Sequence, residues 1–107
     1  MKTPAARRAA PLRLAIAGAA GRLGQLLIRL AAADPGMVLV GAATIPGDTH
    51  LGQDAGRLAG VAELELPLTV ELAAKPDCLV EFTSPAGTEY WARWCAQQGA
   101  ALVSGTT

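Results

Sequence analysis

The stretch LRLAIAGAAGRLGQLLIRLA, residues 12–31, joins an apolar run to a one-sided helical pattern through a turn rich in glycine. Residues 12–17 are apolar except for Arg13, which is typical of a strand buried on both faces. Apolar residues then recur at the spacing of a helix with one apolar face: Leu23, Leu26, Leu27, Leu30 and Ala31. The stretch therefore predicts a strand, a glycine turn and a helix.

The three glycines of this turn, Gly18, Gly21 and Gly24, follow the spacing G-x-x-G-x-x-G, a variant of the dinucleotide-binding pattern G-x-G-x-x-G. A diphosphate can reach main-chain NH groups at a helix N-terminus only where no Cβ blocks its approach. We assign the tight turn to Gly18, the close approach to Gly21 and the packing of helix on strand to Gly24. Arg22 could set a guanidinium beside a phosphate. The alternatives are a turn that merely connects strand to helix and an exposed Arg22.

The rest of the chain alternates short apolar runs with helical patterns. Further strands are expected at residues 37–43, 66–70, 78–82 and 101–103, a helical turn at 71–74, and a helix at about 88–98. Ser84 or Thr83 is expected to cap this last helix, and Gly99 to end it. Residues 44–60 are interpreted as a long loop, in which His50 is a surface residue rather than a catalyst. In the helix at about 88–98, one face carries Trp91, Trp94 and Cys95, which are expected to pack on the sheet.

Strands that alternate with helices and are apolar on both faces predict an α/β fold with a doubly wound, Rossmann-like parallel sheet. The expected strand order is 3-2-1-4-5. In this order the segments GAAGRLG, FTSPAG and GTT follow the first, fourth and fifth strands and meet at one crevice beyond the carboxyl ends of the strands. A crevice at this position is where such sheets bind their ligands.

Length and charge limit the remaining possibilities. A chain of 107 residues with zero net charge fits one domain, expected at residues 12–107 and preceded by a flexible basic tail at residues 1–11. Acidic residues are absent before Asp34, so either a phosphate-bearing partner near the N-terminal half or a solvated tail explains the basic start. We expect no nucleic-acid partner, no membrane span and no metal site. Cys78 and Cys95 are expected to be reduced thiols of a cytoplasmic protein.

Four segments together carry a family resemblance: LRLAIAGAAGRLGQLLI, LGQDAGRLAG, CLVEFTSPAGT and ALVSGTT. In this order and at this spacing they resemble the N-terminal nucleotide-binding domain of 4-hydroxy-tetrahydrodipicolinate reductase, also called dihydrodipicolinate reductase. The resemblance covers about residues 12–107. It implies an NADPH- or NADH-dependent oxidoreductase of the lysine and diaminopimelate pathway, which reduces 4-hydroxy-tetrahydrodipicolinate to tetrahydrodipicolinate. It also implies a small dicarboxylate substrate and a homo-oligomer.

The resemblance implies cofactor-binding residues in four segments. The loop around the pyrophosphate corresponds to Gly18, Ala19, Ala20, Gly21, Arg22 and Leu23. The cofactor cleft is expected to include Phe82, Thr83 and Gly87, and the nicotinamide end to include Gly105, Thr106 and Thr107. After the second strand, where the family often has an acidic residue and an arginine, this chain has Thr44 and Ile45. Thr44 could offer one hydroxyl to the adenosine ribose, the alternative being an ordinary residue at the end of a strand, and the choice between NADH and NADPH stays open.

The family's substrate domain, with its paired histidines and lysine, has no counterpart in these residues. We therefore expect the chain to be the N-terminal part of a longer enzyme, to hold no catalytic residue and to bind a nucleotide without turning over substrate. Two alternatives remain open at this point. One is the nucleotide domain of another dehydrogenase, of homoserine or aspartate-semialdehyde type, and the other is a non-catalytic NAD(P)-binding module.

Overall fold

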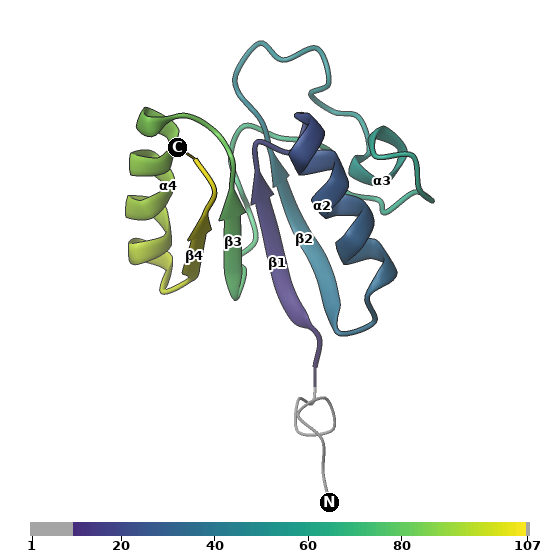
Figure 1. The fold of residues 1–107 in the computed structure, drawn as a ribbon, viewed down its shortest axis with the longest axis horizontal. Coiled ribbons are helices and arrows are strands. Elements are labelled where there is room, and N and C mark those ends of the chain that lie inside the picture. The colour runs from purple at the N-terminus through teal and green to yellow at the C-terminus, as the bar shows by residue number, and fades with distance from the viewer. Residues whose placement is uncertain (1–9, 107) are drawn as a thin grey trace, which may run out of the picture.

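Four parallel strands form one sheet in the order β2-β1-β3-β4 (Figure 1). The computed structural model describes residues 10–106, so residues 1–9 of the predicted tail and Thr107 lie outside it. The strands are β1 (Leu12–Ala17), β2 (Met37–Ala43), β3 (Cys78–Glu81) and β4 (Ala101–Ser104). The helices are α2 (Arg22–Ala33), α3 (Ala55–Leu58) and α4 (Pro85–Gln98). No helix of this described part is long and apolar enough to cross a membrane.

The alternating side chains of β1 divide the core into two layers. Leu14 and Ile16 pack in a cluster with Ile28 of α2. Ala15 lies on the opposite face, in a cluster with Trp91 of α4. Helices therefore cover both faces of the sheet, with α2 on one side and α4 on the other (Figure 1). This arrangement confirms the doubly wound α/β fold.

The helical face of α4 packs on the sheet as predicted. Trp91 and Cys95 are buried against β1 and β3, and Trp94 packs against the same cluster. Trp91 and Trp94 also meet edge to face, with ring centroids 5.5 Å apart. These side chains therefore serve as core.

The prediction of a strand at residues 66–70 is wrong. Only Thr69 lies beside β2, in a single parallel bridge to Ala43, at the position expected for the third strand. The main-chain NH groups of Leu66 and Leu68 are taken up by the segment that leads into α3, and Pro67 has no NH to donate. The predicted helical turn at residues 71–74 does not form.

Both ends of α4 follow from local residues. The helix begins at Pro85, earlier than the predicted start at about residue 88, because the Ser84 hydroxyl accepts a hydrogen bond of 3.1 Å from the NH of Gly87. Of the two predicted caps, Ser84 is therefore correct. Gly99 ends the helix with φ of +71°.

The long loop at residues 44–60 contains the short helix α3, which sequence analysis missed. Asp54 caps this helix by accepting from the NH of Arg57 at 3.1 Å. The same carboxylate accepts from the NH groups of Leu64 at 3.0 Å and Leu66 at 2.8 Å. Asp54 therefore ties α3 to the segment that follows it.

Candidate nucleotide-binding site

The three glycines of the first turn differ in what surrounds them. Gly18 has φ of +85°, and a Cβ there would lie 2.2 Å from the carbonyl oxygen of Phe82. A Cβ at Gly24 would lie 2.2 Å from the carbonyl oxygen of Gly18. A Cβ at Gly21 would meet only that same oxygen, at an ordinary 3.5 Å. The fold itself therefore requires Gly18 and Gly24, whereas Gly21 leaves space that the protein does not fill.

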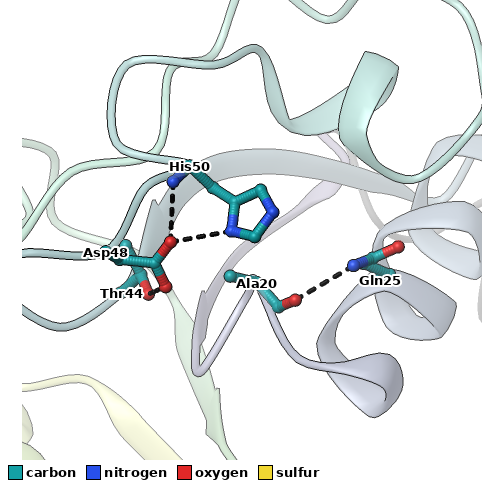
Figure 2. A network of polar contacts seen from close by, with 5 residues as sticks. All are labelled: Ala20, Gln25, Thr44, Asp48 and His50. Atoms are coloured by element: carbon teal, nitrogen blue, oxygen red, sulfur yellow. Dashed lines mark hydrogen bonds and ion pairs between the residues drawn. The ribbon is translucent and has the colours of Figure 1, made fainter.

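The turn presents the uncapped N-terminus of α2. No side chain caps this helix at Gly21, and the first NH groups of a helix have no partner within it. The turn is anchored to the end of β2, because the NH groups of Gly18 and Ala19 both donate to the carbonyl oxygen of Ala43 at 3.0 Å. The Gln25 amide donates to the carbonyl oxygen of Ala20 at 3.0 Å (Figure 2). This geometry suits an anion that accepts from main-chain NH groups.

A cavity of about 980 Å³ opens beside this turn. Its walls come from the glycine turn, the loop after β2, residues 70–71, the segment that joins β3 to α4, and the first turns of α4. The carboxyl ends of the parallel strands point toward this loop region (Figure 1). The cavity thus occupies the crevice where the strand order reverses, between β1 and β3.

Seven of the predicted cofactor residues line the cavity: Gly18, Ala20, Gly21, Thr44, Phe82, Thr83 and Gly87. The side chain of Ala19 is instead fully buried in the core. Arg22 and Leu23 are exposed at the start of α2 and do not line the cavity.

Gly105 and Thr106 do not line the cavity but contact two residues that do. A Cβ at Gly105 would lie 1.8 Å from the Phe82 ring, so any other residue there would displace this ring. The Thr106 hydroxyl accepts a hydrogen bond of 3.0 Å from the NH of Thr83. These two residues therefore support Phe82 and Thr83. Thr107, the last predicted residue, lies outside the described part of the chain.

Asp48 and His50 also line the cavity, and sequence analysis did not assign them to the site. Asp48 accepts from the Thr44 hydroxyl at 2.8 Å and from the NH of His50 at 2.7 Å, and it pairs with His50 Nδ1 at 2.7 Å (Figure 2). The hydrogen bond from the His50 NH, followed by that from Thr44, lowers the pKa of Asp48. The signal in the sequence was a polar cluster soon after the second strand, T-I-P-G-D-T-H.

Charges on the β2 side of the cavity are unbalanced. Asp48 and Glu71 contribute carboxylates, and among the described residues that line the cavity there is no lysine or arginine. A ligand phosphate on this side would therefore meet negative charge without a fixed cation.

Glu81, the last residue of β3, is a fully buried carboxylate beneath this wall. Burial acts to raise its pKa, but hydrogen bonds from Ser104, Thr83, Thr106 and Thr88 outweigh burial and lower the pKa to about 2. Glu81 was not among the residues predicted for the site. The signal in the sequence was the set of hydroxyl residues in the loops after the last two strands.

Together the parallel sheet, the glycine turn and the cavity define a Rossmann-like nucleotide-binding domain. The chain belongs to the family described as dihydrodipicolinate reductase, N-terminus, whose pattern matches residues 12–107.

Curated relatives carry the name 4-hydroxy-tetrahydrodipicolinate reductase. One from Anaeromyxobacter sp. (strain Fw109-5) is 44% identical over 95 residues, which cover 86% of this chain and 35% of that protein. One from Aromatoleum aromaticum is 43% identical over 99 residues, covering 91% of this chain and 36% of that protein. The chain therefore spans little more than a third of the length of these relatives.

Solved structures share the fold. The dipicolinate-bound dihydrodipicolinate reductase from Paenisporosarcina sp. TG-14 matches with a TM-score of 0.67 and 25% identity, over 91% of this chain and 38% of that one. Aspartate semialdehyde dehydrogenase from Candida albicans, solved with NADP, matches with a TM-score of 0.70 and 14% identity, over 92% of this chain and 30% of that one. At 14% identity the second likeness shows the fold alone.

Proposed function

We propose that residues 12–107 are the cofactor-binding domain of a 4-hydroxy-tetrahydrodipicolinate reductase of the lysine and diaminopimelate pathway, with NADH or NADPH as cofactor. Family membership implies a pyridine nucleotide. The observation that carries the proposal is the unfilled space at Gly21, which lies at the uncapped start of α2 and lines the cavity. A diphosphate needs this combination of free NH groups and absent Cβ.

We assign the three parts of the cofactor to three parts of the cavity. The diphosphate lies against the start of α2, and the adenosine ribose lies toward the loop after β2, near Thr44 and Asp48. The pyridine end then lies on the other side of the crevice, near Phe82, Thr83 and Gly87. The bound cofactor supplies the hydride, and this domain holds and orients the ring.

We propose no residue of this chain as a ligand of the dicarboxylate substrate. The relatives named as reductases are much longer than the matched region, which is 35% of the Anaeromyxobacter protein. We propose that catalysis belongs to the whole enzyme, which is cytoplasmic and homo-oligomeric, and that residues 12–107 bind the nucleotide without turnover.

The charges on the β2 side favour NADH over NADPH. The 2′-phosphate of NADPH would approach Asp48 and Glu71 with no lysine or arginine among the described lining residues. Carboxylates can instead accept hydrogen bonds from the free ribose hydroxyls of NADH. We therefore expect this chain to bind NADH more tightly than NADPH.

Titration of this chain with NADH, NADPH, ADP-ribose and AMP tests the proposal. The expected result is a change in dihydronicotinamide fluorescence with saturation, and tighter binding of NADH and ADP-ribose than of AMP, because AMP lacks the diphosphate. Failure of all four to bind would refute it. Equal binding of AMP and ADP-ribose would instead favour a general adenine-nucleotide module, the non-catalytic alternative.

The other alternative, a dehydrogenase of aspartate-semialdehyde type, has weaker support. Its likeness to this chain is one of fold at 14% identity, whereas the relatives named as 4-hydroxy-tetrahydrodipicolinate reductase reach 44%.

A further inference from the structure

Glu81 accepts five hydrogen bonds although its side chain is fully buried. Its Oε1 accepts from the Thr83 NH at 2.9 Å, the Thr83 hydroxyl at 2.6 Å and the Thr106 hydroxyl at 2.7 Å. Its Oε2 accepts from the Thr88 hydroxyl at 2.8 Å and from the Ser104 hydroxyl. All five donors are uncharged, so the negative charge is solvated by hydrogen bonds and has no counter-ion among these partners.

The donors come from three segments, of which the loop after β3 and α4 also line the cavity. Thr83 lies in the loop after β3, Thr88 in α4, and Ser104 and Thr106 at the end of β4 and just beyond it. One carboxylate therefore holds the β3 and β4 ends and α4 in a single arrangement.

The carboxylate also decides which way the Thr83 hydroxyl points. An ionised carboxylate can only accept, so the hydroxyl must direct its single hydrogen toward Glu81. The other acceptor within reach of that hydrogen, the Ser84 carbonyl oxygen, is 3.4 Å away. Thr83 lines the cavity, and its hydroxyl can offer a ligand only lone pairs. A ligand group at this point must therefore donate a hydrogen bond.

We propose that Glu81 is a positioning residue that makes this end of the cavity selective for a pyridine carboxamide over a pyridine carboxylate. The inference rests on the proposed function, which assigns the pyridine end of the dinucleotide to Phe82, Thr83 and Gly87. A carboxamide NH₂ group can donate to the Thr83 oxygen. A carboxylate has no hydrogen to donate, and the buried charge of Glu81 repels it through a medium of low dielectric.

The test compares NADH with the reduced form of nicotinic acid adenine dinucleotide, in which a carboxylate replaces the carboxamide. Both dihydropyridine rings are uncharged, so the two ligands differ only at the group in question. ADP-ribose, which lacks the ring, serves as the reference. We expect this chain to bind NADH at least about tenfold more tightly than the carboxylate analogue, because the analogue lacks the hydrogen bond to Thr83 and is repelled by the charge of Glu81.

Glu81→Gln removes the charge, and because an amide can donate as well as accept, the Thr83 hydroxyl is no longer forced to direct its hydrogen toward residue 81 and can donate to a ligand carboxylate. We expect the preference for NADH to fall below about threefold, because the carboxylate analogue gains affinity relative to ADP-ribose. A disturbed fold would weaken all three ligands and could not produce such a gain. Glu81→Asp retains the charge and is expected to retain the preference.

Thr83→Val supplies a second line of evidence if Glu81→Gln does not fold. It removes the accepting oxygen while Glu81 keeps its charge, so NADH is expected to weaken by about tenfold while ADP-ribose and the carboxylate analogue bind as before. Equal binding of the two dinucleotides by the parent chain, or an unchanged preference in a folded Glu81→Gln variant, would overturn this inference alone. Failure of the parent chain to bind ADP-ribose would overturn the proposed function as well.

Discussion

Replacement of Gly21 by valine should abolish nucleotide binding and leave the fold intact. Gly21 has φ of −74° and ψ of 170°, a backbone conformation that any residue adopts. A Cβ there would have its nearest neighbour at 3.5 Å. The expected loss of folding free energy is below about 1 kcal/mol, because valine is a poorer N-cap residue than glycine.

The effect on binding follows from the same geometry. The space that a Cβ would occupy is the approach of a diphosphate to the NH groups at the start of α2. Each hydrogen bond from a main-chain NH to a charged oxygen contributes about 1.5–3 kcal/mol. Loss of two such bonds would raise the Kd for NADH by at least about a hundredfold.

Two other glycine variants serve as controls for the effects of Gly21→Val on binding and on stability. Gly24→Ala would place its Cβ 2.2 Å from the Gly18 carbonyl oxygen and 2.7 Å from Ala19 Cα, and should destabilise the fold by about 1–3 kcal/mol or more. Gly36→Ala, in the turn between α2 and β2, meets only the movable Asp34 carboxylate at 3.1 Å and should change neither property.

Fluorescence titration with NADH gives the Kd of each variant, and urea unfolding followed by circular dichroism gives its free energy of unfolding. Tight binding of NADH by a folded Gly21→Val variant would show that the phosphates lie elsewhere. An unfolded Gly21→Val variant would show that the space at this turn is smaller than the structure indicates.

Three further predictions concern carboxylates. The pKa of Glu81 is lowered from 4.5 to about 2. The ionised carboxylate should therefore contribute about 3 kcal/mol to stability above pH 4.5, and this contribution should be lost as the pH falls toward 2. In urea unfolding across this range, the free energy of unfolding should change less with pH in Glu81→Gln than in the parent chain. Asp54→Ala should cost about 2–3 kcal/mol in the same assay, since three main-chain NH groups lose their acceptor, whereas Asp54→Asn, which keeps one oxygen, should cost less. Asp48→Asn should narrow the preference for NADH over NADPH by about fivefold, because one negative charge leaves the ribose side of the cavity; an unchanged ratio in the titration would contradict this assignment.

Local residues were sufficient to predict the elements next to the site. These elements depend on residues that are close together in the sequence: the apolar run of β1, the spacing of leucines in α2, Ser84 before α4 and Gly99 after it. The segment at residues 66–70 shows the limit of this reasoning, because its pattern suits a strand but its NH groups bond to the segment around Asp54. Partners distant in sequence decided that outcome.

What the sequence by itself determined was the four parallel strands, the two long helices α2 and α4, the position of the glycine turn, and membership of the nucleotide-binding class. These depend on the period of apolar residues and on the backbone freedom of glycine, both local properties. The contacts that exclude a side chain at Gly18 and Gly24, the inclusion of Asp48 in the cavity and the burial of Glu81 were decided by tertiary structure. Gly18 must be glycine because Phe82 lies beside it, and Glu81 stays charged because Ser104 and Thr106 reach it from another strand. Such contacts form only when the parallel sheet brings the carboxyl ends of its strands together.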